Sequence, residues 1–416
     1  MKKNKPEIRF KGFEEEWEDH DLNYYLVVST EKNQSEEYDK YHIYSVSREY
    51  GVINQIEYQG KSFAGASLSN YGVVFQGDVV YTKSPLKSQP YGIIKTNEGK
   101  TGIVSALYGV FHPTEKVSAT FVQTYFELDS RLNDYLRPLV NKGAKNTLLI
   151  SDSDSLTGKV TFPQKEEQEK LVALFTTLDK LIRKLELKLE KLRNIRQSLL
   201  SQMFTNVNGG GYAVPLIRFK NYNDNWKEEM LEDISQKITD KNINHKYKTV
   251  FTNSAELGII DQKDYFDRNI ANVENTQDYY VVMPDDFVYN PRISTSAPVG
   301  PINRNKLPYE GVMSPLYYVF RFKDKEIDLS YLDYFFKSSI WHGFMYMNGN
   351  SGTRSDRFSI NDNVFSQLPI KHPLLKEEQE KIGALFSILE QQILKTEKKS
   401  FKIRTMKQSL LQKMFA

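Results

Sequence analysis

Residues 165–204 form a continuous stretch of regularly spaced apolar positions that contains no glycine or proline. Leucine recurs at every seventh position, and Leu174, Leu181 and Ile195 lie three residues after three of these leucines. The recurring leucines are Leu171, Leu178, Leu185, Leu192 and Leu199. This spacing is typical of a coiled-coil seam. Pro163 before the stretch, glutamates in its first turn and arginines near its end fit a helix start and the helix dipole. The pattern predicts one long helix that needs a partner.

The partner helix is predicted in the same chain. Residues 376–415 repeat residues 165–204 at an offset of 211, with 22 of 40 positions identical. Both copies begin KEEQEK and later contain ALF and QSLL. The positions of this second stretch that match the heptad leucines are also apolar, with one exception, Thr396. The apolar ones are Ile382, Leu389, Ile403 and Leu410. The repetition predicts two long helices that pair.

The rest of the chain is duplicated as well, which decides its domain organisation. IRFKGFEEEW at Ile8–Trp17 returns as IRFKNYNDNW at Ile217–Trp226, and GDVVYTK (77–83) returns as DDFVYNP (285–291). GIVSALYGVF (102–111) returns as GVMSPLYYVF (311–320), again at an offset near 209. Between these segments the halves differ almost completely. We infer two related modules that share a scaffold and recognise different targets.

Each module is predicted to be α+β. Short β-branched and aromatic segments punctuated by glycine and proline precede helical spacing over residues 121–140, and the second half repeats this order with a helix over 329–345. Phe10, Phe13 and Trp17 are candidate anchors, and the glycine-rich residues 205–211 are a candidate linker. The predicted domains are residues 1–162, 163–206, 207–371 and 372–416: a globular domain, a helix, a second globular domain and a second helix.

Composition narrows the possible classes of protein. The chain has 416 residues, a formal net charge of +3 and no cysteine, which excludes disulfides, thiolate zinc sites and cysteine nucleophiles. Any nucleic-acid surface must therefore be a local patch. No apolar run approaches the length of a membrane span and no signal sequence is evident, so we expect a soluble cytoplasmic protein.

No catalytic or metal motif is found. The six histidines lack metal-ligand spacing, and neither a P-loop nor a dinucleotide-binding glycine motif is present. Residues 290–293 (NPRI) nearly match the NPP[YF] motif of amino-methyltransferases, but Arg292 replaces the second proline. No pair of acids suited to acid-base catalysis stands out. We expect no catalytic residue, no metal site and no cofactor in this chain.

Two loops in each half carry side chains suited to phosphates and base edges. They cover residues 83–91 and 141–146 in the first half and 292–305 and 348–357 in the second. Such residues are also common in ordinary turns, and for Arg48 a surface ion pair is the alternative. The candidate DNA-binding residues are Arg48, Lys83, Ser84, Lys87, Ser88, Gln89, Lys142, Lys145, Asn146, Arg292, Ser294, Thr295, Arg304, Asn350, Thr353, Arg354 and Arg357.

The whole chain resembles the DNA specificity subunits of Type I restriction-modification systems. The resemblance rests on the two long helices, on the repeated strands and on the IRFK segments at Ile8–Trp17 and Ile217–Trp226, which we call the entry segments because each begins one half of the chain. The resemblance implies two target recognition domains separated by two long helices that form an antiparallel coiled coil. Each domain would read one half of a split, asymmetric site in double-stranded DNA. The helices would set the spacer and dock methyltransferase subunits.

By the same resemblance, the subunit has no catalytic activity of its own. It would assemble with two methyltransferase subunits and with restriction/translocase subunits. S-adenosylmethionine, ATP and Mg would bind those partners. Two other readings stay open from the residues: a coiled-coil scaffold whose globular domains bind proteins, and an enzyme with divergent active sites. DNA binding that weakens with salt would distinguish a DNA specificity subunit from the scaffold and from the enzyme, because phosphate contacts release counterions.

Overall fold

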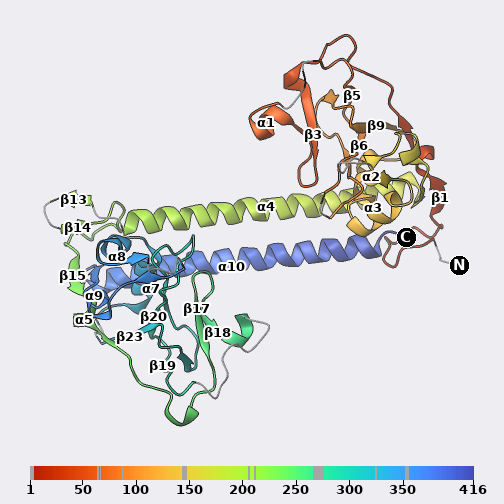
Figure 1. The fold of residues 1–416 in the computed structure, drawn as a ribbon. Coiled ribbons are helices and arrows are strands. Elements are labelled where there is room, and N and C mark those ends of the chain that lie inside the picture. Colours follow the sequence, from red (N-terminus) through yellow and green to blue (C-terminus); the bar gives the residue numbers. More distant parts are fainter. Residues whose placement is uncertain are drawn as a thin grey trace. The chain divides into compact units, whose positions relative to one another are not determined.

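A computed structural model describes residues 4–62, 65, 67–86, 88–142, 148–204, 207–209, 212–265, 276–323, 326–351 and 356–416. The chain divides into two compact units. Unit 1 comprises Met1–Glu186 together with Lys398–Ala416, and unit 2 comprises Leu187–Glu397. Each unit therefore contains part of each long helix (Figure 1).

Unit 1 is a mixed α/β structure, as predicted. Its strands are β1 (Glu18–Asp21), β2 (Leu26–Val28), β3 (Ile43–Ser47), β4 (Gly51–Asn54), β5 (Gly72–Val74), β6 (Val79–Thr82), β7 (Ile94–Thr96), β8 (Gly102–Val104), β9 (Tyr108–Pro113), β10 (Asn141–Lys142), β11 (Leu148–Leu149) and β12 (Lys159–Phe162). Its short helices are α1 (Gln55–Gln59), α2 (Ala119–Tyr125) and α3 (Asp129–Leu136), with 3-10 turns at Leu22–Tyr24, Lys40–His42 and Asp154–Leu156.

Unit 2 repeats this order. Its strands are β13 (Val207–Gly209), β14 (Tyr212–Val214), β15 (Lys227–Met230), β16 (Ser235–Lys237), β17 (Phe251–Ser254), β18 (Gly258–Asp261), β19 (Tyr280–Val282), β20 (Phe287–Tyr289), β21 (Ile302–Arg304), β22 (Gly311–Met313), β23 (Tyr318–Phe322), β24 (Asn350–Ser351), β25 (Phe358–Ser359) and β26 (Pro369–His372). Its short helices are α5 (Leu231–Ile234), α6 (Gln262–Tyr265), α7 (Leu329–Lys337), α8 (His342–Asn348) and α9 (Asp362–Phe365), with a 3-10 turn at Ile243–His245.

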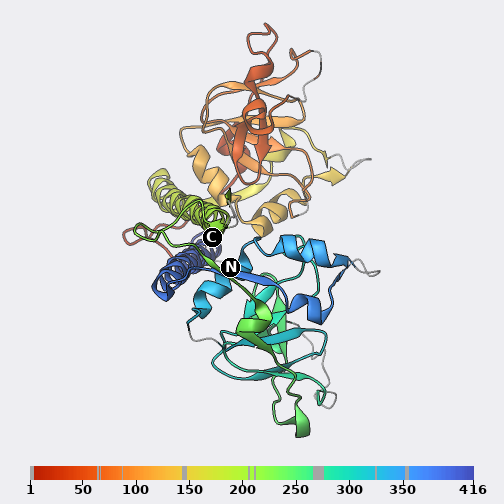
Figure 2. The same ribbon diagram turned by 90° about the vertical axis from the view of Figure 1, so that its left-hand side faces the viewer.

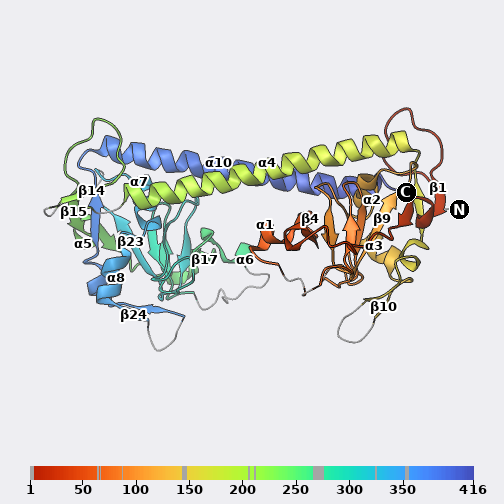
Figure 3. The same cartoon turned by 90° about the horizontal axis from the view of Figure 1, so that it is seen from above.

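The two units share one four-stranded sheet and two of their strand pairs, whereas the sheet β4-β3-β8-β5 of unit 1 corresponds to the separate pairs β17-β18 and β19-β22 in unit 2. In unit 1 the order β2-β9-β6-β7 forms one sheet, and unit 2 has the equivalent order β16-β23-β20-β21. The pairs β1-β12 and β10-β11 also correspond to β15-β26 and β24-β25. In Figure 3, β10 and β24 lie at the edge of their own unit opposite the long helices. In Figure 2, the yellow-orange helices α2 and α3 lie between the sheets of unit 1 and its long helices.

Three predicted segments differ in detail from the structure. The helix expected over 121–140 is divided into α2 and α3, where Arg131 Nη1 donates to the free carbonyl of Tyr125 (2.8 Å). The helix expected over 329–345 is likewise divided into α7 and α8. Within the expected linker, residues 207–209 form β13, which pairs with β14. Backbone pairing, which glycine permits, thus replaces a free linker in the described part.

The long helices α4 (Lys165–Met203) and α10 (Lys376–Lys413) pair antiparallel within each unit. In unit 1, Asp179 and Glu186 of α4 pair with Lys407 and Arg404 of α10. In unit 2, Arg193 pairs with Glu397 and Arg196 pairs with Glu390. Later residues of α4 thus contact earlier residues of α10, as in an antiparallel pair. The predicted coiled coil is confirmed.

The second row of the seam differs in part from the prediction. Leu174 and Leu181 are partly buried against the unit 1 core, as predicted, but Ile195 is 38% exposed, and Phe175 and Met203, four residues after leucines, are buried. Phe175 is 1% exposed, and Phe386 and Ile393 occupy the matching row of α10. A leucine heptad fits either row, because residues three and four apart both lie on the same helix face. The repeat alone could not choose between Leu174 and Phe175.

The C-terminal end of each long helix enters a core. In unit 1, Phe415 just after α10 packs against Trp17, Phe121 and Phe175, with ring centroids 5.7–6.2 Å apart. In unit 2, Phe204 just after α4 packs in the same way against Trp226, Tyr331 and Phe386. The repeated motif QSLLxxMF therefore supplies core residues to a unit. Unit 1 takes them from the far end of the chain.

The KEEQEK motif ties the start of each helix to the entry segment of its unit. Arg9 of IRFK binds Glu167 through Nε and Nη2 (both 2.8 Å), and Arg218 binds Glu378 in the same bidentate way (2.7 and 2.8 Å). Both glutamates are almost fully buried. A buried carboxylate needs such a partner, because leaving it unpaired is costly. This requirement explains why the two segments recur together.

Candidate nucleic-acid interface

The first predicted loop of unit 2, residues 290–300, follows β20 and has a rigid backbone frame. Ser294 N donates to the Ala297 carbonyl (3.0 Å), and Gly300 N donates to the same carbonyl (3.1 Å). The hydroxyl of Tyr289 donates to the Val299 carbonyl (2.9 Å). Burial raises the pKa of Tyr289, which keeps this donor protonated. Gly300 has φ +85°, and a Cβ there would clash with the Asn290 carbonyl, so glycine is required.

The corresponding loop of unit 1, residues 82–92, has the same frame. Leu86 N and Gly92 N both donate to the Gln89 carbonyl (2.9 and 3.2 Å), and the Tyr81 hydroxyl donates to the Tyr91 carbonyl (2.7 Å). Gly92 has φ +96°, and a Cβ there would clash with the Thr82 carbonyl. The two loops therefore correspond residue by residue at an offset of 208.

One shared frame carries different side chains in the two units. Ser84 corresponds to Arg292, and Leu86 corresponds to Ser294. Gln89 corresponds to Ala297, and the two are 2% and 7% exposed. This position points inward in both loops, so Gln89 contributes to the interior, where its Nε2 donates to Asp129. The outward positions are the ones free to contact a ligand.

In unit 2 the predicted loops meet at a cleft of about 530 Å³. Its walls come from the β17–β18 hairpin, the first predicted loop, the turn before β23 and the second predicted loop. The lining residues are 252–257, Gln262, 290–294, Ser296, Pro301, Ser314, Leu316, Tyr317 and Arg357. A β-bridge joins Arg292 and Arg357, which brings the two predicted loops side by side. Arg292 is 66% exposed, with Nη2 3.5 Å from Asp356 Oδ2.

The lining of this cleft suits a nucleic acid. It presents the cations Arg292 and Arg357, the amide of Gln262, several serine hydroxyls and, among the described residues, one carboxylate, Glu256. The amides of Asn253 and Asn290 also line the cleft but are hydrogen-bonded within the unit. Guanidinium groups bind phosphates or guanine edges, and amides bind adenine edges. This set offers hydrogen-bond donors and acceptors for recognition.

In unit 1, three candidate residues gather around Asp129 at the start of α3. Arg48 Nη2 lies 2.6 Å from Asp129 Oδ2, and its Nη1 donates to Ser88 Oγ (2.6 Å). Gln89 binds the other oxygen of the same carboxylate. The structure thus has the ion pair that was the alternative for Arg48, although its side chain remains 52% exposed.

The other described candidates lie at separate places. Lys83 pairs with Asp152 (2.8 Å) and is 17% exposed, whereas Ser84, Thr295 and Asn350 are exposed. Arg304 pairs with Asp285 (2.6 Å) and reaches Ser330 at the start of α7, outside the cleft lining. Lys142 is described only as part of β10. Lys87, Lys145, Asn146, Thr353 and Arg354 lie outside the described residues.

Sequence reasoning named Arg48 of the first hairpin tip but missed the second tip and the turn at 314–317. The tips, SREYG (47–51) and SAELG (254–258), share one turn in which the serine hydroxyl accepts two backbone N–H groups. Gly51 and Gly258 close these turns at φ +75° and +73°. The shared Ser-x-x-x-Gly spacing, inside segments that otherwise differ, was the available signal.

The described residues contain no group of three or more His, Asp or Glu side chains arranged to hold a metal ion. None of their helices is long and apolar enough to cross a membrane.

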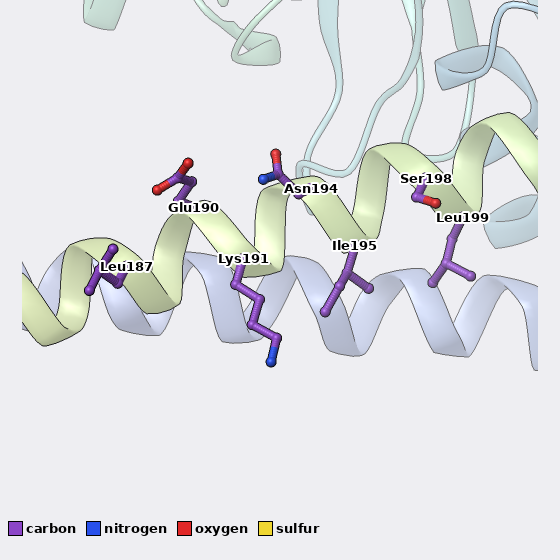
Figure 4. A pocket seen from close by; sticks show the side chains of 7 residues that line it. All are labelled: Leu187, Glu190, Lys191, Asn194, Ile195, Ser198 and Leu199. Carbon is purple, nitrogen blue, oxygen red and sulfur yellow. The ribbon is translucent and has the colours of Figure 1, made fainter. Parts of the chain in front are cut away.

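A shallow groove of about 500 Å³ lies on α4 in unit 2 (Figure 4). Its lining comes from one helix face that includes Leu187, Lys191, Ile195 and Leu199. Leu187 is 60% and Ile195 is 38% exposed, so this face of α4 offers apolar surface to a partner.

Residues 223–403 match the family model described as Type I restriction modification DNA specificity domain. No match was found among curated protein sequences. The Type I restriction-modification S subunit from M. genitalium aligns over 99% of this chain and 99% of its own, at 11% identity and a TM-score of 0.58. The HsdS subunit from Thermoanaerobacter tengcongensis aligns over 96% of both chains, at 15% identity and a TM-score of 0.44. A chain from a structure on complex assembly and conformational transition of the type I R-M system aligns over 96% of this chain and 97% of its own, at 16% identity and a TM-score of 0.47.

Proposed function

Because the chain belongs to the family of Type I restriction-modification DNA specificity subunits, we propose that each of its two units binds one half of a two-part DNA site. The observation that carries this proposal is the shared loop frame with different outward side chains. An identical frame presents each loop to DNA in the same way, while Ser84 and Arg292 offer different chemistry at the same position. Two different half-sites, and hence an asymmetric target, follow from this arrangement.

In unit 2 we assign recognition to the cleft between the β17–β18 hairpin and the loop 290–296. The exposed Arg292 is the leading candidate for a base or phosphate contact, since it lies beside Arg357 and, within the described part of the chain, its one carboxylate partner is Asp356 at 3.5 Å. In unit 1 we assign it to the half-exposed Arg48 and the exposed loop residues Ser84 and Ser88. The subunit would act by recognition alone, without catalysis or a cofactor of its own.

We further propose that the chain assembles with two methyltransferase subunits and with restriction/translocase subunits, which would bind S-adenosylmethionine, ATP and Mg. The apolar face of α4 around Leu187 and Ile195 supports docking of a methyltransferase subunit on the helices. We expect the complex to work in the cytoplasm, with its DNA substrate. A helix of 39 residues is about 58 Å long at 1.5 Å per residue, which supports a role of the helices in setting the spacer.

The test is methylome sequencing of cells that express the chain with its methyltransferase subunits. A methylated sequence with two different halves and a constant spacer supports the proposal. Replacing residues 1–160 with those of a relative should then change only one half. If both halves change together, or no sequence is methylated, the two units do not read DNA separately. Purified complex should also bind this sequence less tightly as salt rises, because phosphate contacts release counterions.

A further inference from the structure

The turn before β9 in unit 1 and the turn before β23 in unit 2 have the same structure and keep the same leucine. In each turn the serine hydroxyl accepts from the leucine N–H (3.4 Å), at Ser105–Leu107 and at Ser314–Leu316. The tyrosine N–H that follows donates to the serine carbonyl (2.9 and 3.0 Å). The residue between serine and leucine differs, alanine in one unit and proline in the other.

Packing explains the tyrosine of this turn but not the leucine. Tyr108 is partly buried against the core cluster that contains Val80 and Val110, and Tyr317 packs against the equivalent cluster in unit 2. Leu107 and Leu316, in contrast, are 63% and 59% exposed. A single exposed leucine is ordinary on a protein surface. The same exposed leucine in the same turn of two units that otherwise differ indicates a contact outside the chain.

The position of the turn identifies that contact. Leu316 lines the cleft that contains Arg292 and Arg357. In unit 1, Lys83 N donates to the Leu107 carbonyl (3.4 Å), which places the leucine beside the start of the corresponding loop. Pro291 stands at the Lys83 position in unit 2 and has no N–H to donate. Leu316 is therefore an apolar side chain among polar donors of the cleft, and Leu107 lies at the equivalent place beside the corresponding loop of unit 1.

We propose that Leu107 and Leu316 make the same apolar contact with the bases of the two DNA half-sites. This inference rests on the proposed function and assigns the contact that the units share, whereas the loops around it differ. A leucine at such a place can pack on the C5-methyl group of a thymine or enter between two stacked bases. Both contacts are apolar and add no charge.

The experiment uses the complete complex with its methyltransferase subunits and a short duplex that carries the methylated sequence. Leu316→Ser and Leu107→Ser are compared with Leu374→Ser, which alters an exposed leucine of unit 2 outside the cleft. We expect each turn variant to bind roughly 10-fold more weakly, in line with a base contact, with an unchanged salt slope. Leu374→Ser should bind like the wild type. A turn variant that binds like Leu374→Ser, or that fails to assemble with the methyltransferase subunits, overturns the proposal.

Replacing the thymines of one half-site by uracil, which lacks the C5-methyl group, separates the two apolar contacts. If the leucine packs on a methyl group, the uracil duplex weakens wild-type binding and leaves Leu316→Ser unaffected. If it enters between bases, uracil changes neither protein, and Leu316→Ser still binds weakly. Failure of the proposed function would look different, because wild-type complex would then show no preference for the methylated sequence.

Discussion

In unit 1 the buried carboxylate of Asp78 is paired with His112, whereas in unit 2 the equivalent carboxylate of Asp286 is paired with Arg321. Both aspartates accept a backbone N–H of their own turn, from Phe75 and from Met283 (both 2.7 Å). His112 Nδ1 lies 2.7 Å from Asp78, and Arg321 binds Asp286 through two nitrogens (2.6 and 2.9 Å). The duplicated scaffold thus keeps the buried acid and allows its cation to change.

The change of cation alters how each unit responds to pH. Burial opposes the charge of His112, but hydrogen bonds to Asp78 and to Glu31 outweigh it and raise its pKa above the ordinary 6.5. Hydrogen bonds from Ser29 and His112 lower the pKa of Glu31 to about 2. Burial raises the pKa of Asp78, and hydrogen bonds to Asp286 raise that of Arg321. Arg321 stays charged at any pH at which the protein is folded.

The largest expected effect tests how each core is completed. A fragment of residues 1–206 lacks Leu411, Met414 and Phe415 of the unit 1 core, but contains the matching Leu200, Met203 and Phe204. A second copy can supply them, so we expect the fragment to form a two-fold dimer. With methyltransferase subunits it should methylate a palindrome built from the first half-site.

Sedimentation of the fragment at micromolar concentration measures its state, and a fragment of residues 1–196, without QSLLSQMF, is the control that should not dimerise. A monomer of residues 1–206, or a dimer that methylates no symmetric sequence, contradicts the equivalence of the two helix ends.

The next effect concerns the ion pair that the two units share unchanged. Arg218→Ala should destabilise unit 2 by about 3–5 kcal/mol, since it leaves the buried Glu378 without its partner. Arg9→Ala should do the same to unit 1. Hydrogen exchange of peptides from each unit in the full chain locates the loss. Arg137→Ala, which removes a surface pair of 66% and 68% exposed side chains, should cost less than about 1 kcal/mol. Equal effects of Arg218→Ala and Arg137→Ala would contradict the assignment.

A smaller effect is expected at the outward loop positions, where the units differ. Arg292→Ala should weaken DNA binding by about 1–3 kcal/mol and relax one base position if Arg292 reads a base. If it contacts a phosphate, affinity falls evenly across sequences and the salt slope decreases. Arg304→Ala is the matched control, because Arg304 is engaged by Asp285 outside the cleft. If the Arg292→Ala variant binds DNA as tightly as this control, Arg292 is not part of the interface.

The smallest effect is the pH response of the two units. Because the folded-state pKa of His112 is raised, its pairing contributes fully below pH 6.5 and is lost as pH rises through the folded-state value. Unit 1 should therefore lose stability relative to unit 2 between neutral and alkaline pH. Hydrogen exchange in β9 and β23, corrected for intrinsic rates, measures the difference. His112→Arg should abolish it, and Arg321→His should transfer it to unit 2. If the pH response persists in the His112→Arg variant, a group other than His112 causes it.

Much of the fold could be predicted from the sequence, because its signals are local or repeated. The duplication, the two long helices and the α+β order of each half needed only internal similarity and apolar spacing. The two cleft loops of unit 2 were also found, since Arg292 and Arg357 lie in polar segments at equivalent places. Arg48 in the first hairpin tip was found, but the second tip and Leu316 were not, because single side chains in short turns carry little pattern.

By itself the sequence determined which segments are equivalent and which of them form long helices. Only the tertiary structure decided which side chains face inward, because that depends on what packs opposite. Leu174 and Phe175 fit a heptad equally well, yet only Phe175 is fully buried, against Phe415. Gln89 has the composition of a surface residue, yet the loop frame turns it inward onto Asp129. Phe415 reads as a helix end, but the core of unit 1 is incomplete without it. Burial of these groups depends on segments far apart in the chain, which no local pattern records.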